Sequence, residues 1–230
     1  QALVGLKNLT TIKTPPTSRK PINTFVKYFS WSLVFSHIQK EVNRRGQVYF
    51  LYNDIKGIPF VVKKIKDRFP EKTVVGASGK MDSKNLEEVV LAFFDGFIDI
   101  LVCTTIIESG LDVTNANTII IHNAQNFGLA QLYQIRGRVG RGKRQASCLL
   151  LIPHGKKLEK DSYNRLKAIE KNTALGSGHA ISQEDLEIRG SGSLFGYKQS
   201  GHISAVGFEM YCDLLRDEIK INSDTLNLFY

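Results

Sequence analysis

The sequence predicts an α/β fold in which a parallel sheet is flanked by helices. Two observations lead to this prediction. Short apolar runs rich in β-branched residues alternate with segments of helical period, and two of these runs, residues 100–103 and 149–152, are almost continuously apolar. Such runs are typical of central strands covered on both faces. We therefore expect an open α/β sheet over residues 22–155.

The expected elements follow one another along this region. Apolar runs indicate strands at residues 22–26, 48–52, 73–76, 98–103, 118–121 and 147–152. Between them, apolar side chains recur at spacings of three, four and seven, which indicates helices with one buried stripe. The stripes are Trp31, Val34, Phe35, Ile38 and Val42; Ile58, Val61, Val62, Ile65 and Phe69; and Leu86, Val89, Val90, Phe93 and Phe94. We expect Asp54 to cap the second helix and Pro70 to end it.

The two ends of the chain differ from this alternating region. Two adjacent prolines at positions 15 and 16 forbid a continuous helix, so residues 1–21 are expected to be a linker. A chain that starts at Gln1 in mid-pattern is expected to be a piece of a longer protein. Basic residues crowd the stretch that follows, so we place a boundary near residue 155. Residues 156–230 are expected to form a small helical hairpin and loop, then a C-terminal helix.

Composition limits the class of protein. There are 31 Lys and Arg residues against 22 Asp and Glu residues, and the resulting formal charge of +9 favours an anionic partner. The three cysteines lie far apart without CxxC spacing, so neither a disulfide framework nor a metal site is expected. No apolar run approaches the roughly 18 residues of a membrane span, and the N-terminus lacks signal architecture. We expect no membrane partner and a reduced, intracellular compartment.

The strongest chemical pattern is a set of arginines separated by glycines. The run from Gln134 to Arg141 reads Q-x-x-G-R-x-G-R and places Arg136, Arg138 and Arg141 within six residues. Guanidinium groups keep their charge, and their planar forks match phosphate oxygens. The intervening glycines let the backbone approach a ligand. A solvated basic surface is the plainer interpretation of an Arg-Gly cluster, but this spacing makes it the weaker one.

The main phosphate-binding parts of an ATPase are missing from the sequence. The run from Gly137 to Arg144 fits G-x-x-x-x-G-K, yet Arg144 stands where a magnesium-binding Ser or Thr is required. No other Walker A run occurs, and no acidic box of the D-E-x-H type follows a strand. We therefore expect the chain to be half of an ATPase, unable to hydrolyse ATP alone.

Loops that follow the expected strands form a second group of candidates, because ligands of open α/β sheets bind at the carboxyl ends of strands. Thr104 and Thr105 open the run that ends at Asp112, after the strand at 98–103. Taken alone this is a weak signal, since hydroxyl groups at strand ends often cap helices. Lys80, after the strand at 73–76, is equally compatible with an exposed lysine.

In their order along the chain, these motifs resemble those of superfamily 2 helicases. The chain is similar, over nearly its whole length, to the second RecA-like motor lobe of bacterial transcription-repair coupling factors, a family of double-stranded DNA translocases. The resemblance implies that Arg138 and Arg141 are arginine fingers that reach the γ-phosphate of ATP. It implies that Gly110, Asp112 and Gln134 lie at the same cleft, and that ATP and Mg²⁺ are held mainly by the missing first lobe. Further segments that carry the resemblance are residues 48–54, 115–121 and 127–134.

The same resemblance assigns DNA contacts and coupling residues. The family's DNA-backbone contacts fall on Asn53, Ser78, Gly79, Lys80, Thr104 and Thr105. Segments 185–192 and 196–201 resemble the translocation motif that this family shares with the RecG family. That motif implies that Arg189 and Gln199 couple ATP hydrolysis to movement along a duplex. A surface ion pair of Arg189 with a neighbouring carboxylate is the alternative. The sequence departs from the family at Lys80 and Gln125, and His122 is expected to be an exposed strand-end residue rather than a catalytic base.

The resemblance also implies a function. It implies an ATP-dependent translocase that removes stalled RNA polymerase and couples transcription to nucleotide excision repair, with RNA polymerase and excision-repair proteins bound by domains outside this chain. The implied compartment is the bacterial cytoplasm, with an organelle of bacterial origin as the alternative. Two alternatives stay open: a RecG-type fork-remodelling translocase and a non-catalytic basic DNA-binding module. Arg138 and Arg141 argue against the module, because a pure binder has no use for fingers.

Overall fold

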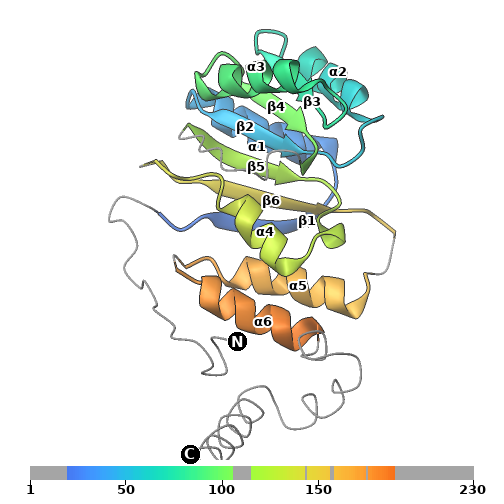
Figure 1. The fold of residues 1–230 in the computed structure, drawn as a ribbon, viewed down its shortest axis with the longest axis vertical. Coiled ribbons are helices and arrows are strands. Elements are labelled where there is room, and N and C mark those ends of the chain that lie inside the picture. The colour runs from blue at the N-terminus through green and yellow to red at the C-terminus, as the bar shows by residue number, and fades with distance from the viewer. Residues whose placement is uncertain (1–19, 106–114, 143, 156–157, 175, 190–230) are drawn as a thin grey trace, which may run out of the picture. The chain divides into compact units, whose positions relative to one another are not determined.

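A six-stranded parallel sheet forms the centre of the structure (Figure 1). The computed structural model describes residues 20–105, 115–142, 144–155, 158–174 and 176–189. The strand order is β1-β6-β5-β2-β4-β3, and every neighbouring pair is parallel. The strands are β1 (Asn23–Tyr28), β2 (Gln47–Leu51), β3 (Val74–Ala77), β4 (Ile100–Cys103), β5 (Ala116–Ile121) and β6 (Ser147–Ile152). The predicted fold class is confirmed.

The apolar runs of the sequence become the central strands. Every residue of β2, β4 and β5 is buried, because helices cover both faces of this part of the sheet. Strand β1 lies at one edge, and its side chains alternate between buried and exposed positions at its start. Burial of apolar strands on both faces therefore fixes which strands lie at the centre.

Helices α1 (Trp31–Asn43) and α2 (Ile58–Arg68) cover one face, where their apolar stripes meet Val48 and Phe50 of β2 in one core cluster. Helix α1 begins at a cap in which Ser30 Oγ accepts a hydrogen bond from the Leu33 N–H (3.2 Å). The expected cap at Asp54 is wrong. The N-cap of α2 is Gly57, whereas the Asp54 carboxylate accepts from the Lys56 N–H (3.1 Å) in the turn before the helix.

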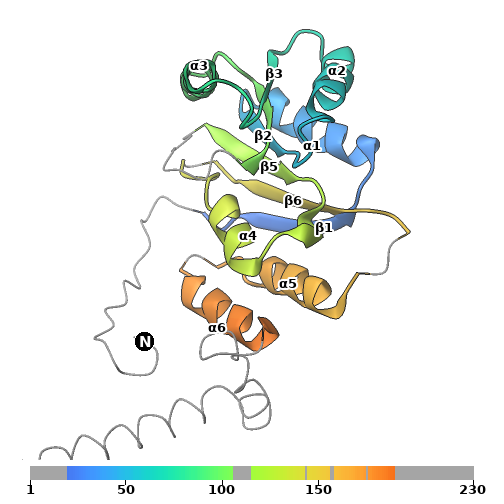
Figure 2. The same cartoon turned by 45° about the vertical axis from the view of Figure 1, so that its right-hand side comes forward.

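The other face carries α3 (Ser83–Phe94), the short helix η2 (Ala124–Asn126), α4 (Leu129–Arg136) and α5 (Lys160–Lys171). Figure 2 shows α1 and α2 on one side of the sheet and α3 and α4 on the other. The Tyr49 ring of β2 packs against Phe93 of α3, with ring centroids 6.0 Å apart. Adjacent residues of one strand therefore serve two different helical layers.

Helix α5 protects the exposed edge of the sheet. It packs against β1 and α4, and Glu170 Oε1 accepts a hydrogen bond from the Val26 N–H of β1 (2.9 Å). An unpaired edge strand is a template for association with another chain, and this carboxylate occupies one of its free donors. The sequence composition changes near residue 155, but α5 packs on the sheet, and the described residues from 20 to 181 belong to one compact unit. Helix α6 (Gly178–Arg189) begins in this unit.

A buried carboxylate joins α1 to the amino-terminal edge of the sheet. Glu41 is 1% exposed, and its Oε2 accepts hydrogen bonds from the Thr118 hydroxyl of β5 and from Arg44 Nη2. Arg44 Nη1 donates to the Gln145 carbonyl (2.8 Å), and Arg144 Nη1 donates to the Arg44 carbonyl (2.8 Å). These contacts tie the end of α1 to the residues that lead into β6.

The Glu41 carboxylate can be tested by removing it. Glu41→Ala should lower the free energy of unfolding by about 2–4 kcal/mol, because the buried Thr118 hydroxyl and the Arg44 guanidinium lose their acceptor. Urea unfolding followed by circular dichroism measures this loss. The control Glu88→Ala, on an exposed position of α3, should change stability by less than about 0.5 kcal/mol. Equal effects of both substitutions would contradict the structural role of Glu41.

Candidate nucleotide and DNA sites

The arginine-rich loop between α4 and β6 lies at the amino-terminal edge of the sheet. The Gly140 N–H donates to the carbonyl of Ala116, the first residue of β5 (3.3 Å). Gly140 has φ +73°, and a Cβ at this position would lie 2.6 Å from the Cβ of Ala146. Only glycine combines this left-handed backbone with so close an approach. The loop is therefore packed onto the sheet beside the start of β6.

Arg136, one of the three arginines of the motif, is a structural residue. It is 3% exposed, and its Nη1 donates to the Ile169 carbonyl of α5 (2.9 Å) and to the Thr24 hydroxyl of β1 (3.4 Å). Its guanidinium also lies over the Tyr133 ring, 5.2 Å from the centroid. Burial lowers the pKa of Arg136 from its ordinary value. The sequence suggested that all three arginines are suited to bind phosphate. In the structure, Arg136 instead holds α4 against α5 and β1.

Three of the five residues expected at the nucleotide, Gln134, Arg138 and Arg141, line one pocket of about 350 Å³, and Arg136 also lines it. Gln134 and Arg141 are exposed and Arg138 is half-buried. Arg141 Nε also donates to the Gly137 carbonyl (3.4 Å). The guanidinium groups of Arg138 and Arg141 and the Gln134 carboxamide suit the oxygens of a phosphate group. The lining offers no carboxylate, the usual protein ligand of Mg²⁺.

The expected DNA-contacting residues lie at the opposite, carboxyl-terminal edge, after the adjacent strands β2, β4 and β3. Two backbone hydrogen bonds join the ends of these strands: the Tyr52 N–H donates to the Cys103 carbonyl (2.8 Å), and the Thr104 N–H donates to the Ala77 carbonyl (3.4 Å). The strand order therefore gathers three loops that are far apart in the sequence. The residues expected to contact DNA there are Asn53, Ser78, Gly79, Lys80, Thr104 and Thr105.

These residues differ in how accessible they are. Asn53, Gly79 and Lys80 are exposed, and Thr105 is partly exposed. Ser78 is also partly exposed, and its carbonyl accepts from the Met81 N–H (3.0 Å). Thr104 is only 7% exposed. Thr105 is therefore the accessible hydroxyl of the threonine pair.

A stacked aromatic pair lies beside these loops and was not expected from the sequence. The Tyr52 and His122 rings are stacked with centroids 4.5 Å apart, and Phe29 meets His122 edge-on at 5.2 Å. Burial lowers the pKa of His122, although the nearby Asp54 charge opposes this shift. His122, which the sequence suggested as an exposed strand-end residue, is instead half-buried and packed against the Tyr52 and Phe29 rings. The sequence shows that His122 follows β5 and that Tyr52 follows β2. It does not show that these two strands are neighbours in the sheet, which brings the two rings together.

Some expected features lie outside the described residues, namely Gly110, Asp112 and Gln199. Arg189 is the last residue of α6, the helix expected from the charged run before it. Within the described part of the chain, no three His, Cys, Asp or Glu side chains are grouped so as to hold a metal ion. None of the described helices is long and apolar enough to cross a membrane.

Comparison with known families identifies the lobe that carries these sites. Residues 32–143 match the helicase conserved C-terminal domain, a span that includes β2 to β5, α4 and the three arginines that line the pocket. This part of the chain, just under half of its residues, is a helicase conserved C-terminal domain. The sheet thus has the fold of RecA-like helicase C-terminal lobes.

Full-length relatives extend the similarity of this helicase lobe. The transcription-repair-coupling factor of Helicobacter pylori is 45% identical over 218 residues, which is 95% of this chain and 22% of that protein. The factor of Escherichia coli is 44% identical over 95% of the chain and 19% of that protein. The structure of RecG bound to a three-way DNA junction is similar with a TM-score of 0.66 and 34% identity, over 78% of this chain and 24% of that one. The chain therefore spans about a fifth of the length of these relatives.

The different roles of the arginines can be separated by conservative substitution. Arg136→Lys should lower the free energy of unfolding by about 1–3 kcal/mol, because a lysine cannot reproduce the guanidinium contacts with Ile169 and Thr24. Arg141→Lys, at an exposed position, should change it by less than about 0.5 kcal/mol. Thermal unfolding followed by circular dichroism measures both. Indistinguishable melting curves for the two variants would exclude a structural role for Arg136.

Proposed function

We propose that the longer protein containing this helicase lobe is an ATP-dependent double-stranded DNA translocase that removes stalled RNA polymerase and couples transcription to nucleotide excision repair. The observation that carries the proposal is 42–45% identity to transcription-repair-coupling factors over 95–96% of the chain. An alignment of that extent includes positions 189 and 199, beyond the helicase domain match. RNA polymerase and excision-repair proteins would bind domains outside this chain.

In this proposal the arginine pocket serves the transfer of the phosphoryl group. ATP, held with Mg²⁺ mainly by the first motor lobe, supplies the phosphoryl group whose transfer to water drives movement. Arg138 and Arg141 would stabilise negative charge on that group, and Gln134, with Gly110 and Asp112, would complete the wall of the cleft. The loop is fixed to the sheet through Gly140, so approach of the first lobe would present both guanidinium groups without further rearrangement.

The opposite edge of the sheet would grip the DNA backbone. Asn53, Ser78, Gly79, Lys80 and Thr105 offer backbone and side-chain donors, and Thr104 would contribute mainly by holding its neighbour in place. Such contacts are directed at phosphates and read no sequence, as a motor that moves along any duplex requires.

Movement would be transmitted by the lobe as a rigid body. ATP acts at one edge of the sheet and DNA at the other, so a rotation of the lobe at the nucleotide displaces the DNA-gripping loops. Arg189, at the end of α6, and Gln199 would couple this rotation to translocation.

A RecG-type fork-remodelling translocase is the second candidate function. It is favoured by the 34% identity and the TM-score of 0.66 with RecG bound to a three-way DNA junction. Both candidates require the arginine pocket and the DNA loops, and they differ in what the moving protein displaces. A non-catalytic basic DNA-binding module would need the DNA loops but not the arginine pocket.

The central test uses the full-length parent protein with Arg141→Ala. This change should reduce DNA-stimulated ATP hydrolysis by about 10³-fold or more and abolish ATP-dependent release of RNA polymerase stalled on duplex DNA. Arg68→Ala, at an exposed arginine of α2, is the matched control and should change neither. Fork regression without polymerase release in the unsubstituted protein would favour the RecG-type function. Unchanged ATP hydrolysis in Arg141→Ala would refute the finger assignment.

The DNA loops predict a separate salt-dependent effect. Lys80→Ala should weaken binding of the parent protein to duplex DNA roughly equally for all sequences, and should reduce the slope of log affinity against log salt by about 1, because one phosphate contact is lost. Fluorescence anisotropy over a series of salt concentrations measures both quantities. Lys66→Ala, an exposed lysine of α2, should leave the slope unchanged. An unaltered slope in Lys80→Ala would remove this residue from the DNA site.

A further inference from the structure

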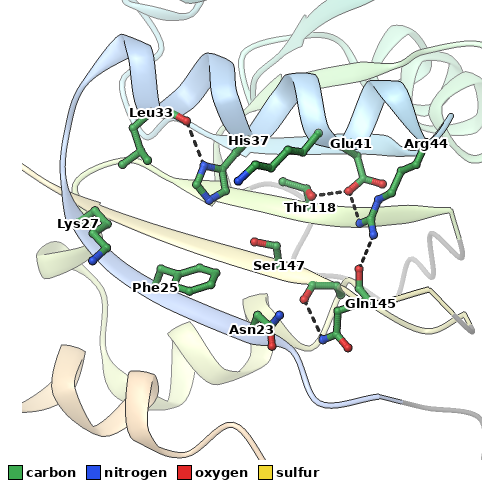
Figure 3. A pocket seen from close by; sticks show the side chains of 12 residues that line it. Asn23, Phe25, Lys27, Leu33, His37, Glu41, Arg44, Thr118, Gln145 and Ser147 are labelled. Atoms are coloured by element: carbon green, nitrogen blue, oxygen red, sulfur yellow. Dashed lines mark hydrogen bonds and ion pairs between the residues drawn. The ribbon is translucent and has the colours of Figure 1, made fainter.

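A second pocket, of about 510 Å³, lies between α1 and the strands β1 and β6 (Figure 3). It is on the opposite face of the sheet from the arginine pocket. Thr24 contacts Arg136 on the α4 and α5 side, whereas the next residue, Phe25, contacts His37 of α1. The groove borders β1 and β6, at one end of the sheet. Strands β4 and β3, two of the three that lead into the DNA loops, lie at the other end. Neither proposed motor site therefore includes it.

The base of this groove is apolar and accessible. Phe25 is 39% exposed, although it lies on a sheet face, because the main contacts of α1 on this face are with β2 and β5. Leu33 of α1 lines the facing wall, and the His37 and Phe25 rings meet in a T-shaped arrangement with centroids 6.3 Å apart. A phenyl ring, an aliphatic side chain and an imidazole form a surface suited to an aromatic or aliphatic anchor.

The rim of the groove is positively charged. Lys27 and Lys40 are both exposed, and neither forms an ion pair with a described residue. The single carboxylate of the lining, Glu41, is buried and engaged by Arg44 and Thr118, as Figure 3 shows. The charge that an incoming ligand meets is therefore that of two lysines.

Strand addition is disfavoured as a mode of binding here. The outward N–H of Val26, in the middle of β1, already donates to Glu170. A partner would therefore bind through side chains in the groove rather than by extending the sheet.

We propose that this groove docks an acidic segment of a partner protein. An aromatic or aliphatic side chain of that segment sits against Phe25 and Leu33, and its carboxylates face Lys27 and Lys40. The apolar base disfavours a DNA backbone, which offers no anchor for it. Residues 1–19 of this chain contain no Asp or Glu, so they lack the charge that the rim selects.

The test begins with the 230-residue chain and a random library of 12-residue peptides displayed on phage. Enriched peptides are synthesised with a fluorescein label, and their affinities are measured by fluorescence anisotropy. They should carry net negative charge with at least one aromatic or aliphatic residue. Affinity should fall about tenfold or more in the double variant Lys27→Glu/Lys40→Glu and in Phe25→Ser. Circular dichroism checks that each variant remains folded.

The matched control is Lys66→Glu/Lys84→Glu, which changes the net charge equally at exposed positions outside the groove. It should alter affinity less than about twofold at physiological salt. Equal weakening by both double variants, failure to enrich acidic peptides, or insensitivity to Phe25→Ser would overturn the proposal. A labelled DNA duplex is measured in parallel. If Lys27→Glu/Lys40→Glu weakens duplex binding and leaves peptide binding unchanged, the groove is a DNA surface and the proposal fails.

Discussion

All six strands run in the same direction, and the two proposed motor sites depend on this constraint. In a parallel sheet each connecting helix runs back against the strands, so loops after strands and loops after helices collect at opposite edges. Asn53, Lys80 and Thr105 follow strands, whereas Arg138 and Arg141 follow α4. The separation of the DNA loops from the arginine pocket is thus a consequence of topology, and it allows one rigid lobe to respond to two ligands.

Buried ionic groups hold the amino-terminal edge together. Arg136 and Glu41 are each almost completely buried, a costly situation unless every charged group finds a partner. Arg136 meets this cost with a carbonyl, a hydroxyl and an aromatic ring. Glu41 offsets part of it through Oε2, which accepts from Arg44 and Thr118, while its buried Oε1 has no hydrogen-bond partner among the described residues. Both side chains bridge different elements on either side of the arginine loop. The buried side chains of Arg136 and Glu41 therefore fix the elements around the loop, and the loop presents its own arginines to solvent from this fixed base.

Local patterns in the sequence were sufficient for the fold class and for most elements, since period and apolar runs are local properties. They could not give the strand order, because the adjacency of β2, β4 and β3 arises from contacts between distant segments. For the same reason the spacing of the motif does not distinguish Arg136 from Arg138. The family resemblance assigns the finger role to Arg138 and Arg141, and the position of α5 and β1 shows that the Arg136 guanidinium is enclosed. His122 and Asp54 were misjudged because the Tyr52 ring that packs on His122 and the turn before α2 depend on tertiary context.

The groove beside α1 follows from the widths of the elements. A helix is about 10 Å across and neighbouring strands are about 4.8 Å apart, so one helix covers about two strands. Two helices, α1 and α2, cover this face of a six-stranded sheet, and their main contacts are with β5, β2, β4 and β3. The two strands left over are β1 and β6. Phe25 is accessible because the described part of the lobe has no third helix on this face, and the lysines beside it give the uncovered strip a charge as well as an apolar base.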